Sequence, residues 1–159
     1  MCGIVGFLDP AVNSESTQLI QSMMDSIKHR GPDDQNHYVK QEHGLAFGHV
    51  RLSIIDISNG AQPMFSPDGR YVMIYNGEVY NFLELRQLLH QKGHKLKTYS
   101  DTEVILHMYM EFGKDMLNQL NGMFSFAIYD HEERTTFIAR DHFGVKPFYY
   151  YQKDNLFAF

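Results

Sequence analysis

Apolar residues recur along this chain with two spacings, and these spacings predict strands interrupted by helices. Residues 3–8 form an apolar run that Asp9-Pro10 closes, which is typical of a buried strand. Apolar residues at 19–27 follow helical spacing instead. The strands expected are residues 3–8, 36–39, 45–50, 71–75, 123–129, 135–140, 148–151 and 156–159.

Two capping signatures predict helices in the middle of the chain. Asn81 with Glu84, and Ser100 with Glu103, each place an acidic residue three positions after a capping side chain. A glycine then closes each helical stretch. The helices expected are residues 19–27, 81–93 and 100–113, with a short one at 116–120. A loop rich in Ser, Gly, Pro and Asp is expected at 56–69.

The order of these elements indicates the fold class. Strands come first, two central helices follow, and further strands separated by hairpin-like gaps complete the chain. This order predicts an α+β fold with antiparallel sheets rather than a doubly wound parallel sheet.

Composition narrows the classes of function. The 159 residues fit one domain, and the net charge of −5 argues against a broad nucleic-acid surface. No apolar stretch approaches the roughly 20 residues of a membrane span, and the first residues lack the basic and apolar regions expected of a signal peptide. A single cysteine cannot form an internal disulfide, so we expect a reducing, cytoplasmic setting. Because Phe159 lies inside an expected strand, the domain is predicted to be truncated at its C-terminus.

The lone cysteine, Cys2, is the first candidate for chemistry. Aminopeptidases remove Met1 when the next side chain is small, and this removal would place a free α-amine beside the thiol. An α-amine titrates near pH ~8 and a thiol near ~8.5, so one residue can supply both nucleophile and base. A lone cysteine is more often a small buried apolar residue. Its place at position 2, before Gly-Ile-Val-Gly-Phe, favours the catalytic interpretation.

Asn76-Gly77 follows an expected strand and precedes Glu78. The pair readily takes positive φ and is usually a turn. A side-chain amide N–H and a backbone N–H can also hold the oxyanion of a tetrahedral intermediate. Both interpretations of Asn76 and Gly77 stand at this point.

A glutamine substrate needs a cation for its α-carboxylate and an anion for its α-ammonium group. Arg51, after the strand at 45–50, could bind the carboxylate through two hydrogen bonds. Asp101 and Glu78 are candidates for the ammonium group. Taken singly, Arg51 could be a surface residue, and Asp101 could simply favour a helix N-terminus.

The nine histidines do not form a recognisable metal site. His90 and His94 have i, i+4 spacing, but Gly93 is expected to end the helix between them, and no H-E-x-x-H occurs. We therefore expect no metal site.

Six motifs in sequence order resemble the glutaminase domain of glutamine-hydrolysing asparagine synthetases. The resemblance runs from residue 1 to residue 159. The motifs are Met1-Cys2-Gly3-Ile4-Val5-Gly6, His29-Arg30-Gly31-Pro32-Asp33-Asp34, Arg51-Leu52-Ser53-Ile54-Ile55-Asp56, Tyr75-Asn76-Gly77-Glu78-Val79-Tyr80-Asn81, Ser100-Asp101-Thr102-Glu103 and Arg140-Asp141-His142-Phe143-Gly144-Val145-Lys146-Pro147. Departures from the family pattern are mild, with His142 where Arg is common and Phe148 where Leu is common.

This resemblance implies a fold, a reaction and a set of site residues. The fold implied is that of the N-terminal nucleophile hydrolases, a four-layer αββα sandwich of antiparallel sheets. Residues 1–159 would form a class II glutamine amidotransferase domain that hydrolyses glutamine to glutamate and ammonia. The roles carried over are the nucleophile for Cys2, the oxyanion hole for Asn76 and Gly77, and substrate binding for Arg51, Leu52, Ser53, Ile54, Ile55, Glu78 and Asp101.

The resemblance also implies partners outside these residues. In the family, a synthetase domain uses ATP and magnesium ion to activate aspartate, which then receives the ammonia. Its Ser-Gly-Gly-x-Asp-Ser loop does not occur in this sequence. We therefore expect glutamine as the substrate, no cofactor for this domain, and a C-terminal synthetase domain as its partner, with a homodimer left open.

Two alternatives remain open. The missing half could amidate a sugar or a peptide carboxylate instead of aspartate. If Met1 is retained, the proposed base is an amide without useful basicity, and the chain would be a non-catalytic binding module.

Overall fold

Two antiparallel sheets face each other in this structure, a computed structural model that describes residues 2–13, 15–52 and 60–159. The first sheet has the strand order β2-β3-β1-β9-β8, and the second has the order β4-β5-β6-β7. The strands of the first sheet are β1 (Gly3–Leu8), β2 (Asp34–Lys40), β3 (Leu45–Arg51), β8 (Tyr151–Lys153) and β9 (Leu156–Ala158). The strands of the second sheet are β4 (Met64–Phe65), β5 (Tyr71–Val79), β6 (Gly122–Asp130) and β7 (Thr135–Arg140).

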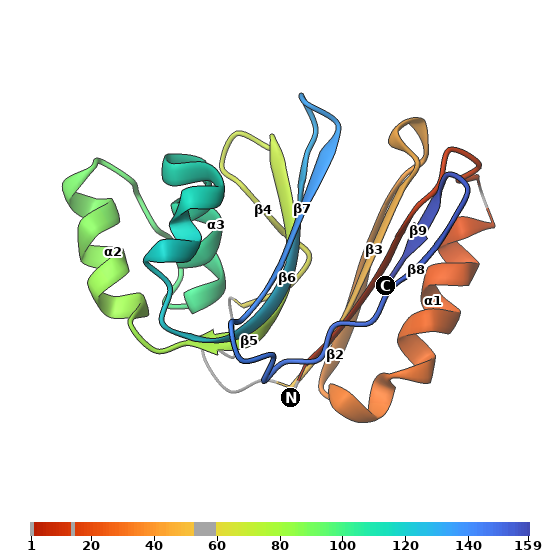
Figure 1. Cartoon of the computed structure of the whole chain (residues 1–159), viewed down its shortest axis with the longest axis horizontal. Coiled ribbons are helices and arrows are strands. Elements are labelled where there is room, and N and C mark those ends of the chain that lie inside the picture. The colour runs from red at the N-terminus through yellow and green to blue at the C-terminus, as the bar shows by residue number, and fades with distance from the viewer. Residues whose placement is uncertain (1, 14, 53–59) are drawn as a thin grey trace.

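Helices cover the outer face of each sheet (Figure 1). Helix α1 lies on the first sheet, and α2 and α3 lie on the second. The two sheets diverge toward the top of Figure 1 and come together at the bottom, where the N-terminus lies. The helical segments are α1 (Ser16–Ser26), α2 (Phe82–Gln91) and α3 (Asp101–Phe112), with short 3-10 turns η1 (Lys28–Arg30), η2 (Gln41–His43) and η3 (Gly113–Asn118).

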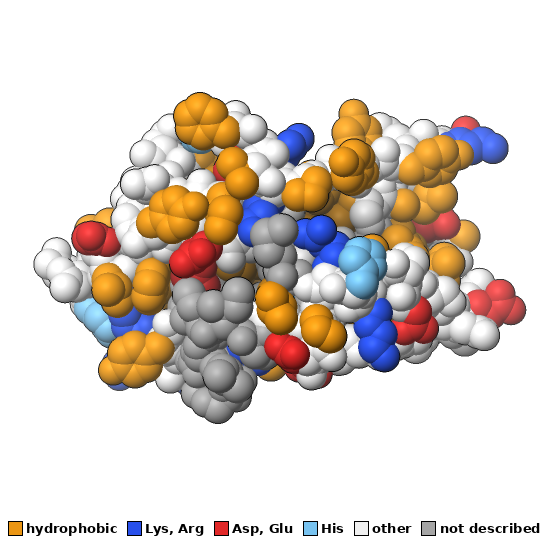
Figure 2. Space-filling model, turned by 90° about the horizontal axis from the view of Figure 1, so that it is seen from below, with side chains coloured by type: hydrophobic (Ala, Val, Ile, Leu, Met, Phe, Trp, Pro, Cys, Tyr) orange, Lys and Arg blue, Asp and Glu red, His pale blue; other side chains and the backbone are white. Residues whose placement is uncertain are grey.

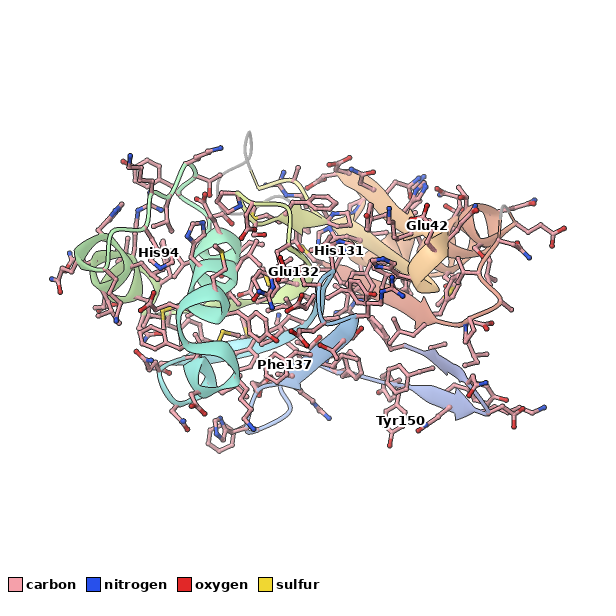
Figure 3. The ribbon with its side chains drawn as sticks, turned by 90° about the horizontal axis from the view of Figure 1, so that it is seen from above. Glu42, His94, His131, Glu132, Phe137 and Tyr150 are labelled. Atoms are coloured by element: carbon pink, nitrogen blue, oxygen red, sulfur yellow. The ribbon has the colours of Figure 1, made fainter. Side chains whose placement is uncertain are left out.

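Three hydrophobic cores separate these four layers. One core joins α1 to the first sheet, a second lies between the sheets, and a third joins the second sheet to α2 and α3. Phe137 of β7 contributes to the third of these cores (Figure 3). Its ring stacks on Tyr109 of α3 with centroids 5.3 Å apart. The predicted four-layer αββα arrangement is therefore confirmed.

Period-two alternation in the central strands builds this layering. In β5, Val72 and Ile74 enter the core between the sheets, whereas Met73 and Tyr75 enter the core beneath α2 and α3. Successive side chains of a strand point to opposite faces, so a continuous apolar run serves two cores. The uninterrupted apolar stretches therefore mark strands that are buried on both faces.

Most predicted elements are present, and the main error concerns Asn76-Gly77. The pair is not a turn: β5 continues to Val79, with Asn76 opposite Ser125 and Gly77 opposite Phe124 in β6. Gly77 does not have a positive φ. A Cβ atom on Gly77 would lie 2.4 Å from the carbonyl oxygen of Met123, so close contact with the neighbouring strand requires glycine here.

Smaller differences occur at the ends of elements. Strand β4 lies inside the predicted loop at 56–69, and the strand predicted at 148–151 begins only at Tyr151. Asn81 does not cap α2 with its side chain. Its Nδ2 instead donates to the Gln119 carbonyl oxygen at 2.9 Å, and its Oδ1 accepts the Asn121 N–H at 3.0 Å. Ser100 does cap α3, accepting the Thr102 N–H at 3.1 Å. In the part of the chain that the structure describes, no helix combines the length and apolar character of a membrane span.

His49 links the two sheets. Only 1% of the residue is exposed, and its Nε2 lies 3.2 Å from the carbonyl oxygen of Tyr75. A carbonyl can only accept, so Nε2 carries the proton. Burial lowers the pKa of His49 from 6.5 to about 4. The neutral ring is therefore the form that the fold holds.

This burial predicts an acid-sensitive contribution to stability. The pKa of His49 is depressed in the folded chain, so its contribution is fully present above pH 6.5 and is lost as the pH falls toward 4. We expect His49→Gln, which keeps an amide donor, to flatten the dependence of unfolding free energy on pH by up to about 1.4 kcal/mol per pH unit. Urea unfolding at several pH values measures it, with the exposed His142→Gln as control. Parallel slopes in wild type and His49→Gln would contradict the assignment.

Candidate active site

Cys2 lies directly before β1, the central strand of the first sheet. Its Sγ lies 3.4 Å from the backbone nitrogen of Leu52, which donates to it, and 3.6 Å from the Leu52 carbonyl oxygen. Arg30 Nε donates to the Cys2 carbonyl oxygen at 3.2 Å. Cys2 is half-buried and lies where β1 begins and β3 ends.

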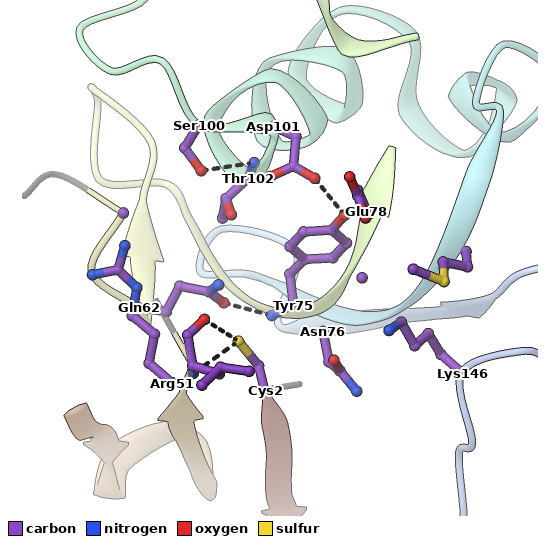
Figure 4. A pocket seen from close by; sticks show the side chains of 14 residues that line it. Cys2, Arg51, Gln62, Tyr75, Asn76, Glu78, Ser100, Asp101, Thr102 and Lys146 are labelled. Carbon is purple, nitrogen blue, oxygen red and sulfur yellow. Dashed lines mark hydrogen bonds between the residues drawn. The ribbon is translucent and has the colours of Figure 1, made fainter. Parts of the chain in front are cut away.

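A pocket opens around this thiol at the end where the sheets converge (Figure 4). The residues that line it come from both sheets and from the start of α3. They are Cys2, Arg51, Leu52, Gly60, Gln62, Tyr75, Asn76, Gly77, Glu78, Ser100, Asp101, Thr102, Met123 and Lys146. Figure 2 views the molecule from this end, where basic and acidic side chains gather near the centre between scattered hydrophobic ones.

The edge of β5 that faces away from β6 supplies backbone donors to the pocket. The N–H of Tyr75 donates to Gln62 Oε1 at 2.6 Å, and the N–H of Val79 donates to Asp101 Oδ2 at 3.1 Å. Backbone N–H groups of alternate residues point to the same side of a strand. The N–H of Gly77 therefore points to this edge, between the other two. The Asn76 side chain, only 4% exposed, also lines the pocket.

Asp101 begins α3 and forms the acidic side of the pocket together with the exposed Glu78. Its Oδ2 accepts the Tyr75 hydroxyl at 2.7 Å in addition to the Val79 N–H. Burial raises the pKa of Asp101, the two hydrogen bonds oppose that rise, and the charge of Glu78 adds to it. Burial raises the pKa of Tyr75 well above its usual range, so its hydroxyl remains a donor. A bound ammonium group would offset the cost of burying the Asp101 charge and would reduce its repulsion by Glu78.

Arg51 ends β3 and forms the basic side of the pocket. The residue is 8% exposed, and Figure 4 shows Arg51 and Glu78 on opposite sides of the pocket, with Cys2 below. Opposite charges on two sides of one pocket suit the two ends of an α-amino acid. The neighbouring Leu52 lines the pocket as well. Ser53, Ile54 and Ile55, also predicted to bind substrate, lie outside the described residues.

The structure thus brings together seven of the ten predicted site residues: Cys2, Arg51, Leu52, Asn76, Gly77, Glu78 and Asp101. It adds five polar residues that sequence reasoning did not assign to the site: Gln62, Tyr75, Ser100, Thr102 and Lys146. Gln62 lies in a segment expected to be only a loop. Tyr75 and Lys146 lie within motifs that resemble the glutaminase domain. Their place in those motifs was the signal that could have identified them as site residues.

No histidine is among the described residues that line this pocket. His49, the buried histidine that links the two sheets, does not line the pocket. Its bond to Tyr75 O and its low pKa make it a structural residue. Across residues 2–13, 15–52 and 60–159, no group of three or more His, Cys, Asp or Glu side chains is placed to hold a metal ion.

The amino-acid sequence is similar to those of two asparagine synthetases. Asparagine synthetase [glutamine-hydrolyzing] 3 of Bacillus subtilis is 44% identical over 163 residues, covering 100% of this chain and 26% of the relative. Asparagine synthetase [glutamine-hydrolyzing] 1 of Arabidopsis thaliana is 40% identical over 150 residues, covering 94% and 25%. The chain thus spans about a quarter of the length of these relatives.

The fold has solved counterparts. The glutamine phosphoribosylpyrophosphate amidotransferase of B. subtilis matches 99% of this chain and 41% of its own, with a TM-score of 0.78 and 21% identity. This likeness shows the fold, which is that of the N-terminal nucleophile hydrolases. The sequence itself matches the glutamine amidotransferase domain family over residues 1–159, and the chain belongs to that family.

Proposed function

We propose that this domain hydrolyses glutamine to glutamate and ammonia, with Cys2 as the nucleophile once Met1 has been removed. One observation carries the proposal: a thiol, two cations and two carboxylates line a single pocket, and the Leu52 N–H donates to the thiol. Arg51 would bind the α-carboxylate of glutamine, and Asp101 with Glu78 would bind its α-ammonium group. The side-chain amide of the substrate then reaches Cys2.

The reaction is acyl transfer in two steps. The α-amine of Cys2 takes the thiol proton, and the thiolate attacks the carboxamide carbon. The Asn76 side-chain N–H and the Gly77 backbone N–H hold the resulting oxyanion. The α-ammonium returns the proton to the departing nitrogen, so ammonia leaves and a glutamyl thioester remains. Water then attacks the thioester, releasing glutamate and restoring the thiol.

In the whole protein, we propose that the ammonia amidates aspartate in an ATP- and magnesium-dependent synthetase domain. The names of the relatives support this acceptor. A sugar or peptide carboxylate is the alternative acceptor. The domain itself needs no cofactor for the steps above, because its own residues supply the nucleophile, base and oxyanion donors. A nucleophilic thiol must stay reduced, which supports a cytoplasmic location. Exposed tyrosines beside and in edge strand β8 support a homodimer.

The role of Arg51 predicts a specific loss of substrate affinity. We expect Arg51→Ala to weaken glutamine binding by about 30-fold or more, since losing a charge-assisted pair to a buried carboxylate costs on the order of 2–5 kcal/mol. Calorimetry in a Cys2→Ser background measures the Kd without turnover. Arg134→Asn, at an exposed turn residue with φ of 52°, is the matched control. Unchanged affinity in a folded Arg51→Ala chain would remove Arg51 from the site.

The hydroxyl of Tyr75 predicts a smaller effect that depends on pH. Tyr75→Phe removes one hydrogen bond from Asp101, so the carboxylate is less firmly held and more easily protonated. We expect glutamine affinity to fall by roughly 10-fold, because a hydrogen bond to a charged group is worth about 1.5 kcal/mol or more. The loss should grow as the pH is lowered. Tyr71→Phe, outside the pocket on the same strand, should bind normally; equal behaviour of the two variants would argue against the role.

The nucleophile assignment predicts selective covalent labelling. Cys2→Ser should lower glutaminase activity by several orders of magnitude while glutamine binding persists, because an alcohol ionises far less than a thiol near neutral pH. A diazo-oxo-norleucine compound should add its mass to the processed wild-type chain but not to Cys2→Ser or to a Met1-retaining form. Mass spectrometry reads both the N-terminus and the adduct. Comparable labelling of the Met1-retaining chain would show that the α-amine is not the base.

A further inference from the structure

Lys146 is a buried cation in the pocket to which the proposed reaction assigns no role. Only 3% of the residue is exposed, and it lines the pocket with Cys2, Asn76 and Gly77. In Figure 4 its side chain reaches toward Asn76 from the side of the pocket opposite Arg51. A buried lysine is uncommon because desolvation disfavours its charge. Its place beside the reacting groups therefore needs an explanation.

The loop that carries Lys146 is built to hold it in place. The Asp141 carboxylate accepts three backbone N–H groups, from Phe124 at 3.2 Å, Val145 at 2.9 Å and Lys146 at 3.0 Å. From the other side, the Arg140 guanidinium donates to the carbonyl oxygens of Lys146 and Gly144, at 2.8 and 2.6 Å. Two charged side chains thus fix the backbone on both sides of the lysine.

Gly144 shows how closely this loop is packed. Its φ is +63°, and a Cβ atom there would lie 2.2 Å from an Arg140 guanidinium nitrogen. Asp141 also joins the loop to β6, since its backbone N–H donates to the Phe124 carbonyl oxygen at 2.8 Å. Phe124 pairs with Gly77 in β5. The lysine is therefore fixed relative to the strand that carries the oxyanion donors.

The charges around Lys146 are mixed. Burial and the guanidinium of Arg30 lower the pKa of Lys146, whereas Cys2, Glu78 and Asp141 act in the opposite direction. These groups come from η1, the start of β1, β5 and the loop after β7. Arg30 is the one of these neighbours that opposes the positive charge on Lys146.

Building on the proposed function, we propose that Lys146 is a further catalytic residue. Its ammonium group stabilises the negative charge that forms first on the Cys2 thiolate and then on the oxyanion of the tetrahedral intermediate. The charge is already in position before glutamine binds, so no reorganisation accompanies the reaction. Asp141 and Arg140 act as positioning residues, because they hold the loop without reaching the substrate.

The single cysteine permits a test that does not depend on turnover. Iodoacetamide is neutral, and Cys2 is the one thiol in the sequence. The rate of alkylation against pH, followed by mass spectrometry on chains with Met1 removed, reports formation of the thiolate. We expect Lys146→Met and Lys146→Gln to move the midpoint of this profile upward by about one pH unit, as expected on removing a nearby opposite charge. Lys146→Arg should restore it, and Lys114→Met, at an exposed residue of η3, should match wild type.

Glutamine turnover provides the second readout. We expect the neutral variants to lose roughly 10- to 1,000-fold in kcat, by comparison with the loss of one oxyanion donor, with less than about threefold change in glutamine Kd. An alkylation profile of Lys146→Met that coincides with wild type would overturn the proposal. An inactive wild-type chain would instead count against glutamine hydrolysis, while the alkylation profiles would still decide the role of Lys146.

If neither neutral variant folds, as judged by thermal unfolding, the comparison moves to the folded wild-type chain. The peptide Cys-Gly-Ile-Val has the same free α-amine and thiol but no lysine. A lower alkylation midpoint in the protein than in the peptide supports stabilisation of the thiolate. An equal or higher midpoint overturns the proposal.

Discussion

The buried outer edge of β5 is the constraint from which the site follows. Strand β4 pairs only with Val72 and Met73, so the N–H groups farther along that edge need other partners. A buried N–H group without a partner is costly. Gln62 accepts a hydrogen bond from the N–H of Tyr75, and Asp101 accepts one from the N–H of Val79. The N–H of Gly77 lies between them and faces the pocket, where a developing oxyanion is the natural acceptor. A full-length β4 would have satisfied this edge and left no site.

One acceptor on this edge, Asp101, both takes a backbone hydrogen bond and presents a charge to the substrate. Asp101 satisfies Val79 N–H with an oxygen that also accepts the Tyr75 hydroxyl, so its carboxylate is oriented before any ligand arrives. Burial makes that carboxylate costly to keep charged, which is the cause of its raised pKa. A substrate ammonium group offsets this cost, and Arg51 across the pocket does the same for a carboxylate. Preorganised, desolvated charges of this kind favour a zwitterionic ligand over a neutral amide.

Sequence patterns predicted most of the strands and helices because the spacing of apolar residues follows local burial. The run at Gly3–Leu8 and the Ser100 cap both have the predicted structure. The strand predicted at 71–75 was ended too early because turn propensity is local, whereas the pairing of Asn76 and Gly77 with β6 and the close contact at Met123 O are tertiary. Asn81 failed as a cap because its amide has better partners across the chain, near Gln119. Lys146 was missed because its burial depends on contacts that spacing does not encode.

The site also depends on the packing of one sheet against the other. Cys2 and Arg51 belong to the first sheet, whereas the oxyanion donors and Asp101 belong to the second sheet and the helix on it. Their separation is set by the core between the sheets and by the bond from His49 to the Tyr75 carbonyl, one residue before Asn76. Catalytic geometry tolerates errors of only about 0.5 Å. Volume changes in this central core should therefore affect turnover more than equal changes beneath α1, where one sheet alone supports the helix. This is a physical reason for a four-layer architecture whose reacting groups meet where the two inner layers converge.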